Sequence, residues 1–292
     1  MAILKLQALG GRGVNTVDLD IRLLGDYDFA TTSTTSAKFF DNGSNYALFT
    51  GTGFKYLKSG PFIQDITAGT VTKFDLVISG VKVFAFSDAN LSAAKLFDFY
   101  IAGNPTGARN YVFAGNDTIT GTGFADVISS GGGNDVVSGG SGNDTLYGNT
   151  GNDTLNGDAG NDVLRGESGI DKLYGGKGAD KLYGGVGADT FIFKAASEST
   201  VASSGRDKIF DFSQSEKDRI DLKSIDANTK VAGDQAFKFI GTDVFHNKAG
   251  ELRYEKKSGD TFIHGDTNGD GKADFSIVLD PSVTLKSGDF LL

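Results

Sequence analysis

The sequence predicts an all-β protein in three parts, and three observations lead to this prediction. A nine-residue, glycine-rich repeat runs through the middle of the chain, strand-like segments separated by turns follow it, and segments of alternating polar and apolar residues precede it. We therefore expect a small β-rich head over residues 1–110, a parallel β-roll over 111–192 and a β-rich cap over 193–292. The head becomes α+β if its last segment forms a helix.

The central repeat consists of nine consecutive units between Val112 and Ile192, with the consensus Gly-Gly-x-Gly-x-Asp-x-apolar-x and no insertion. Its sixth place always holds an aspartate: Asp117, Asp126, Asp135, Asp144, Asp153, Asp162, Asp171, Asp180 and Asp189. A helix is excluded because each of its many glycines would cost about 1 kcal/mol relative to alanine. We predict that each unit is a glycine turn and a short strand whose eighth, apolar side chain points inward. Two units then form one coil of a stacked parallel roll.

The aspartates create an electrostatic problem whose solution is a cation. Eleven acidic and four basic residues lie between residues 112 and 192, a net charge of −7 in a chain whose net charge is −9. Stacked carboxylates repel one another, and carboxylate and carbonyl oxygens are the ligands that Ca²⁺ prefers. With each site built from the turns of units n and n+2, nine units allow at most seven Ca²⁺ sites. We expect the fourth-place glycines to present the carbonyl groups: Gly133, Gly142, Gly151, Gly160, Gly169, Gly178 and Gly187.

A glycine-rich linker is the alternative for this segment, but a linker would not hold an apolar residue at one fixed phase. Units such as "GGSGNDTLY" and "GGKGADKLY" resemble the RTX, or haemolysin-type, calcium-binding repeats, and this resemblance implies a parallel β-roll with calcium in its turns. The first unit, "VFAGNDTIT", lacks the leading glycines, and the second, "GTGFADVIS", has Phe124 where a glycine is expected. These departures weaken the expectation of calcium at the first two turns.

Strand-like segments follow the repeats at "RDKIFDF", "DRIDL", "AFKFIG", "ELRYEKK" and "DTFIH". A stacked repeat needs such a cap, because its last coil would otherwise expose an apolar face and an open strand edge. The run from "GADTFIF" through "RDKIFDFSQSEKDRIDL" to "SGDFLL" resembles the C-terminal domain of the serralysin-type metalloproteases. This resemblance implies an uncleaved export signal at the C-terminus and a type I secretion apparatus as partner. The chain would stay unfolded at low cytosolic calcium and fold outside the cell, where calcium is about millimolar.

The loop "DTNGDGKAD" is a weaker calcium candidate. Like the start of an EF-hand loop, it places four oxygen-bearing residues around Gly271: Asp266, Asn268, Asp270 and Asp274. Ile277 stands where the glutamate that closes such a loop is required. The same residues also favour an Asx-rich hairpin turn without a metal, and both interpretations stay open.

Composition narrows the class of function. The chain has no cysteine and only two histidines, His246 and His264, so disulfides, thiolate nucleophiles and a His-Glu-x-x-His zinc motif are excluded. A Gly-x-Ser-x-Gly motif is absent as well, and we expect no catalytic residue. The acidic balance disfavours nucleic acid as a partner. No apolar run predicts a transmembrane segment, and the N-terminus lacks the pattern of a secretory signal, so export is expected to use another route.

The head is predicted from two alternating segments, "TKFDLVI" and "VKVFAF", joined as a hairpin near Ser79 and Gly80. A short helix over "LSAAKLFDFY", capped by Asp88 or Asn90, is a further expectation. Six aromatic residues are expected to be core rather than a platform for sugar rings: Phe39, Phe40, Tyr46, Phe49, Phe54 and Tyr56.

These features together predict a secreted, calcium-binding protein without enzymatic activity. Its head is expected to bind a cell-surface or matrix polysaccharide, as an adhesin does. Two alternatives remain open. One is a small polysaccharide-modifying enzyme, a lyase, epimerase or glycosidase that uses paired carboxylates in the head. The other is a surface-layer or biofilm component that assembles with itself in the presence of calcium.

Overall fold

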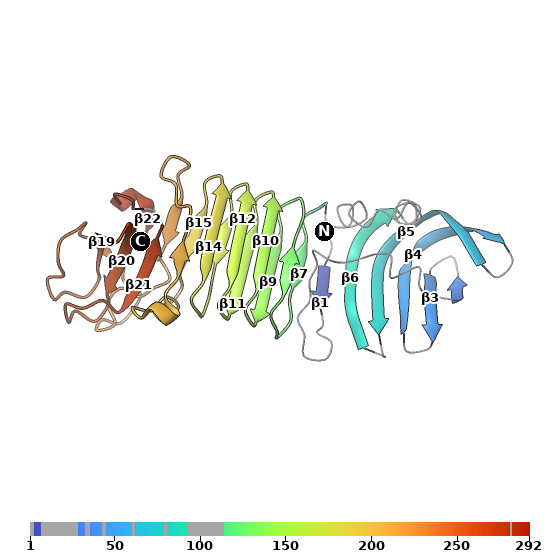
Figure 1. Cartoon of the computed structure of the whole chain (residues 1–292), viewed down its shortest axis with the longest axis horizontal. Helices are drawn as coiled ribbons and strands as arrows, with labels where there is room; N and C mark the ends of the chain where they lie inside the picture. The colour runs from blue at the N-terminus through green and yellow to red at the C-terminus, as the bar shows by residue number, and fades with distance from the viewer. Residues whose placement is uncertain are drawn as a thin grey trace.

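The computed structural model describes residues 114–280 and 282–292 in full, together with the backbone of six strands between residues 3 and 92. The molecule is elongated, with the N-terminal strands at one end, the repeats in the middle and the C-terminal strands at the other end (Figure 1). Two sheets run along it, one of thirteen strands and one of nine. Within the described residues the regular elements are strands and two short 3₁₀ turns, η2 (Ser203–Gly205) and η3 (Ser287–Asp289). The predicted all-β class is confirmed.

The head is an antiparallel meander in which neighbours in the chain are neighbours in the sheet. Its strands are β2 (Phe29–Thr32), β3 (Ser36–Asn42), β4 (Asn45–Ser59), β5 (Phe62–Ile78) and β6 (Val81–Ser92). The first strand of the chain, β1 (Ile3–Leu6), lies beyond β6 and pairs with it in antiparallel fashion. On its other side β1 runs parallel to β7, the first strand of the roll. Head and roll therefore share one sheet.

One prediction for the head is confirmed and one is wrong. Ile78 of β5 pairs with Val81 of β6, which is the predicted hairpin. Asp88 and Asn90 do not cap a helix, because both lie within β6, where Leu91 still pairs with Val71 of β5. The remainder of the expected helix lies outside the described residues. The side chains of the six aromatic residues on β3 and β4 also lie outside what the structure describes.

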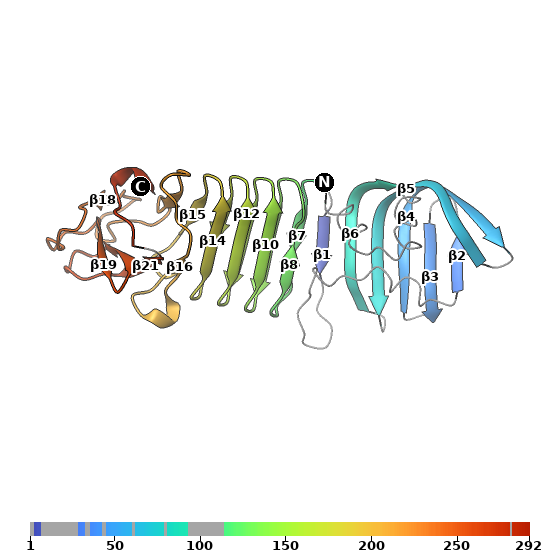
Figure 2. The same ribbon diagram turned by 45° about the horizontal axis from the view of Figure 1, so that its top comes forward.

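In the roll, successive strands alternate between the two sheets, so that units two apart lie side by side (Figure 2). The thirteen-stranded sheet takes β7 (Thr118–Thr120), β9 (Val136–Ser141), β11 (Thr154–Ala159), β13 (Lys172–Tyr174) and β15 (Thr190–Ile192). The nine-stranded sheet takes β8 (Val127–Ser129), β10 (Thr145–Thr150), β12 (Val163–Ser168) and β14 (Lys181–Val186). All these pairs are parallel, and Leu155 lies opposite Leu173, two units later. The prediction of two units per coil is confirmed.

The eighth-place side chains form one buried column between the two sheets. All nine, from Ile119 to Phe191, are at most 1% exposed. Burying one such side chain stabilises the fold by about 1.5–3 kcal/mol. The nine sixth-place aspartates are at most 2% exposed. The roll therefore pairs a thin apolar core with a row of buried carboxylates, and the carboxylates need compensation of their own.

The two sheets continue into the cap without a break. β16 (Lys208–Ile209) pairs with β14, and β17 (Arg219–Asp221) pairs with β15. β21 (Phe275–Leu279) then pairs with β16, and β22 (Phe290–Leu291) with β17. The nine-stranded sheet is completed by β18 (Lys238–Phe239), β19 (Glu251–Lys257) and β20 (Asp260–Asp266). The five strand segments predicted after the repeats are confirmed, whereas β21 and β22 are additions that the sequence analysis does not predict.

Aromatic contacts close the far end of the core column. The ring of Phe237 meets the ring of Phe275 edge-on, with centroids 5.6 Å apart, and Phe239 packs against Phe290 at 5.1 Å. Phe237, Phe275 and Phe290 belong to the same hydrophobic cluster as the column of the roll, and Phe239 packs against that cluster. No helix among the described residues has the length and apolar character needed to cross a membrane.

Candidate metal centre

Each edge of the roll carries a ladder of sixth-place aspartates. The backbone N–H of Asp153 donates to Oδ1 of Asp171, eighteen residues later, over 2.7 Å. The equivalent bond is made by every sixth-place aspartate from Asp117 to Asp171, at 2.7–2.8 Å. Units of odd number form one ladder and units of even number the other. One oxygen of each acceptor carboxylate is thereby fixed, and the second oxygen remains to be accounted for.

The second oxygen, Oδ2, is buried without a hydrogen-bond partner on most rungs. Among the described residues this holds for Asp135, Asp144, Asp153, Asp162, Asp171, Asp180, Asp189 and Asp207. A buried acceptor left unsatisfied costs about 1–3 kcal/mol, and a charged one costs more. Eight such oxygens in one fold call for compensating positive charge.

A cradle of oxygen atoms surrounds this second oxygen in the fourth to seventh units. A Cβ placed on Gly148, the first residue of its unit, would meet Oδ2 of Asp153 and lie 2.8 Å from the carbonyl oxygen of Gly166. The same arrangement recurs around three more rungs, Asp144, Asp162 and Asp171. The missing side chain therefore leaves room between a carboxylate oxygen and a carbonyl oxygen, both of which are ligands for Ca²⁺.

Comparison with known proteins agrees with this geometry. Three overlapping segments, 111–146, 138–173 and 157–191, match the family model of the RTX calcium-binding nonapeptide repeat. Residues 111–191 are RTX calcium-binding repeats. The RTX repeats therefore bind Ca²⁺, and we propose that the four cradles hold it. The bound ion supplies the positive charge that the buried carboxylates lack.

Solved structures similar to the chain include two subunits of the mannuronan C5-epimerase of Azotobacter vinelandii. The AlgE6R2 subunit is 25% identical, over 56% of this chain and 90% of that one, with a TM-score of 0.37. The AlgE6R3 subunit is 24% identical, over 61% of this chain and 78% of that one, with a TM-score of 0.30. No curated protein matches the chain.

The structure shows two roles for glycines in the RTX repeats, and the predicted contribution of the fourth-place carbonyl groups to calcium binding stays a prediction. The predicted fourth-place glycines have φ between 117° and 148°, which a side chain rarely adopts. A Cβ on Gly151 would also collide with the carbonyl group of Gly133 in the preceding coil, so these glycines allow the coils to approach closely. The glycines that open space beside the carboxylates are those of the first place, such as Gly148 and Gly157. Their role is not apparent from the sequence, although the consensus contains them.

The early RTX units close their own sites with protein groups. Oδ2 of Asp126 accepts hydrogen bonds from the backbone N–H of Thr122 at 2.6 Å and from its hydroxyl at 2.9 Å. In the third unit Ser130 replaces the first-place glycine, and its hydroxyl donates to the carbonyl group of Gly148 over 2.9 Å. The sequence already weakened the expectation of calcium at the second turn, and this geometry agrees with that. The effect of Ser130 is not predicted from the sequence.

Burial shifts the titration of the RTX carboxylates. Loss of hydration raises the pKa of Asp144 to about 6 and that of Asp162 to about 7, and the charges of neighbouring rungs add to the rise. The same causes raise the pKa of Asp153 to about 7. A proton and a calcium ion therefore compete for the same oxygens near neutral pH.

Asparagines of the fifth place form a further ladder. The backbone N–H of Asn152 donates to Oδ1 of Asn134 at 2.7 Å, and the N–H of Ile170 donates to Oδ1 of Asn152 at 2.7 Å. These side chains satisfy turn N–H groups of the next coil in the same ladder. In the frequent "GND" of the repeats, the asparagine thus belongs to a neutral ladder and the aspartate to a charged ladder.

The charged ladders extend beyond the RTX repeats. The N–H of Asp180 donates to Oδ1 of Asp207 at 2.8 Å, and that of Asp189 donates to Oδ1 of Asp218 at 2.9 Å. Neither acceptor is among the predicted ligands. Asp207 keeps the nine-residue phase, 18 residues after Asp189, but the glycine consensus is lost after Ile192, and Asp218 follows Asp207 by 11 residues and is out of phase. A local signal was present, since "GRDKI" and "DRI" repeat the spacing from aspartate to a buried isoleucine.

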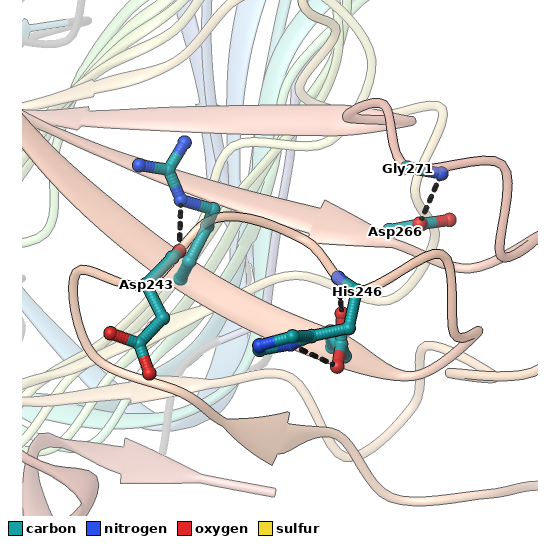
Figure 3. Close-up of polar contacts among 6 residues, drawn as sticks. Asp243, His246, Asp266 and Gly271 are labelled. Atoms are coloured by element: carbon teal, nitrogen blue, oxygen red, sulfur yellow. Dashed lines mark hydrogen bonds and ion pairs between the residues drawn. The ribbon is translucent and has the colours of Figure 1, made fainter.

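The loop between β20 and β21 is built as a turn (Figure 3). Oδ1 of Asp266 accepts the N–H of Gly269 at 2.6 Å, and Oδ2 accepts that of Gly271 at 2.9 Å. Asp274 accepts hydrogen bonds from Thr267 and from the side chain of Asn268, at 2.6–2.8 Å. Hydrogen bonds within the loop satisfy these carboxylates, which is the geometry of the Asx-rich hairpin. The calcium alternative for this loop stays a prediction.

The two histidines have structural contacts. Nδ1 of His246 lies 2.9 Å from Oε1 of Glu251, whose other oxygen accepts the backbone N–H of His246 at 2.7 Å (Figure 3). Arg253 donates from Nε to the carbonyl group of Asp243 at 2.7 Å and holds the same loop. His264 lies in β20, in the strand expected for it.

Proposed function

We propose that calcium folds this chain outside the cell, after export through a type I secretion apparatus. The observation that carries the proposal is the row of buried carboxylate oxygens without hydrogen bonds along the RTX repeats. Without calcium these rungs repel one another and lack hydration, which favours the unfolded chain. Calcium that binds only the folded state stabilises it by about 2.7 kcal/mol per site at a hundredfold excess over Kd. Several such sites make folding respond steeply to the calcium concentration.

Calcium-dependent folding of the roll also bears on the head, because the two share one sheet. β1 is parallel to β7 of the first coil and antiparallel to β6 of the head. A folded first coil therefore offers the strand edge along which β1 pairs, and β1 in turn offers an edge to β6. Folding of the RTX repeats on calcium binding therefore stabilises the folded head through these backbone hydrogen bonds.

The ligand that we propose for the head is a polysaccharide of a cell surface or extracellular matrix, and the proposed role is adhesion. The support is architectural: the head is an antiparallel sheet at one end of a rod whose other end is the cap (Figure 1). A rigid, calcium-loaded rod suits a protein that holds a binding domain away from an anchoring surface.

Binding of the calcium-loaded full chain to a panel of bacterial and plant polysaccharides tests this role. Product analysis and light scattering on the same samples complete the experiment, and the chelated chain is the control. Calcium-dependent binding without new products supports the adhesin. New products indicate a polysaccharide-modifying enzyme instead, and calcium-dependent growth of particle size without polysaccharide indicates a self-assembling surface component.

A further inference from the structure

The two carboxylate ladders end differently in the cap. On Asp218, the last rung of one ladder, Oδ2 accepts the backbone N–H of Ser213 at 2.8 Å. On Asp207, the last rung of the other, Oδ2 is buried and has no hydrogen-bond partner among the described residues. The Asp207 residue is only 1% exposed. The backbone thus compensates one terminal carboxylate and leaves the other bare.

The segment between β15 and β16 supplies the surroundings of Asp207. The hydroxyl of Ser199 accepts the N–H of Asp207 at 2.9 Å and donates to the carbonyl group of Ser276 in β21 at 2.7 Å. The ladder therefore stops at Ser199, which also ties the segment to the cap. Its neighbour Glu198 is buried, and its charge acts on both Asp180 and Asp207.

Glu198 is held in place and keeps capacity for a ligand. Oε1 accepts the hydroxyl of Tyr174 at 2.7 Å, and Oε2 accepts the backbone N–H of Lys194 at 2.7 Å. Each carboxylate oxygen can accept a second interaction, so these bonds orient the group without saturating it. The charges of two buried carboxylates thus act on each other, and neither carboxylate makes an ion pair with a basic side chain among the described residues.

We propose that Asp207 and Glu198 bind a further divalent cation at the junction of the roll and the cap. Their oxygen ligands suit Ca²⁺. This site lies outside the RTX match, which ends at residue 191. Because Glu198 precedes Ser199, the cation would fasten the cap to the last coil of the roll. Docking of the cap onto the roll would then require calcium directly, in addition to the calcium that the roll requires to fold.

Counting the ions bound to the full chain by native mass spectrometry at saturating calcium tests the proposal. Asp207→Asn keeps the acceptor for the N–H of Asp180 but removes the charge, and we expect it to bind one ion fewer than the unmodified chain. Asp218→Asn is the matched control, and we expect it to bind the full number because Ser213 already occupies its second oxygen. An unchanged number in Asp207→Asn overturns the proposal.

A second variant decides the matter if Asp207→Asn does not fold. Glu198→Gln keeps a carbonyl acceptor for the hydroxyl of Tyr174, and we expect it also to lose one ion. We further expect faster hydrogen exchange in residues 193–205 and β21, with protection of the RTX strands unchanged. A full ion number in Glu198→Gln, or unaltered exchange at the junction, contradicts the assignment.

Discussion

The hydroxyl of Ser130 donates to the carbonyl group of Gly148 over 2.9 Å, in the space that first-place glycines leave open in later units. One oxygen atom therefore distinguishes a closed rung from an open one within the same ladder. The carboxylate of this rung, Asp135, is as buried as its neighbours, at 1% exposed. We infer that the side chain at the first place, more than the aspartate itself, decides whether a unit has room for calcium.

Replacing Ser130 by glycine should open a further site. We expect Ser130→Gly to bind one more Ca²⁺ per chain than the unmodified protein, because Oδ2 of Asp135 and the carbonyl group of Gly148 would then face an open cradle. Ser141→Gly makes the same chemical change at a third place and should leave the number unchanged. Equilibrium dialysis measures both variants, and an equal number in Ser130→Gly argues against the cradle as the binding site.

Adding a methyl group at a first place should close a site without removing any charge. A Cβ on Gly157 would meet Oδ2 of Asp162 and lie 2.5 Å from the carbonyl oxygen of Gly175. We expect Gly157→Ala to lose one Ca²⁺ and to need more calcium for folding. Gly115→Ala is the control, because its Cβ would have no atom within 4 Å. Calcium titration followed by circular dichroism compares the two, and coincident curves would refute this prediction.

Substitution of one rung should have opposite effects with and without calcium. Asp153→Asn keeps an acceptor for the N–H of Asp135 but removes one buried charge. At saturating calcium we expect the loss of one or two ions and lower stability, by up to about 2.7 kcal/mol per lost site at a hundredfold excess over Kd. In chelator the variant should be more stable than the unmodified chain, since repulsion is relieved. Thermal unfolding under both conditions checks the reversal of sign.

The sequence allows the roll to be predicted because its period is unbroken. An aspartate and an apolar residue at fixed phase determine turns, strands and the two units per coil, and the structure repeats them. After Ile192 the glycine consensus is lost, so Asp207 escapes notice although it keeps the nine-residue phase, and Asp218 is out of phase as well; both continue the ladders. The roles of the first-place and fourth-place glycines also cannot be predicted from the sequence. They depend on which carbonyl groups of the next coil lie nearby.

Local sequence patterns give the wrong secondary structure where pairing between strands determines it. The segment after "VKVFAF" contains Asp88 and Asn90, which are good helix caps, yet β6 remains extended through Ser92, and its Leu91 and Ser92 pair with β5. The loop beginning at Asp266 has the spacing of a calcium ligand set, yet its carboxylates find N–H donors within the loop itself. In the head, strand pairing outweighs the local helix pattern. In the loop, the Asx-rich turn accounts for the carboxylates without a metal, and calcium there stays a prediction.

The calcium-free roll should become more stable as the pH falls. The pKa of Asp153, Asp162 and Asp189 rises from 3.8 to about 7 in the folded state, chiefly because burial removes hydration. The folded state therefore binds more protons than the unfolded state between pH of about 4 and 7. Stability from protonation is fully present below that range and is lost as the pH rises through it.

Circular dichroism in chelator measures this dependence, and we expect more folded chain at pH 5 than at pH 8. At limiting calcium the direction should reverse, because protons displace Ca²⁺ from the same oxygens as the pH falls. A folded fraction that does not change with pH in chelator would mean that the ladder carboxylates are not buried in the calcium-free state.

The most direct test of the account is a calcium titration of the chelated full chain at neutral pH, with bound ions and secondary structure measured on the same samples. We predict a cooperative gain of β-structure that coincides with the binding of at least four Ca²⁺ per chain, one for each complete cradle at Asp144, Asp153, Asp162 and Asp171. A roll that is already folded in chelator, or one that binds fewer than four ions at millimolar calcium, would contradict the account.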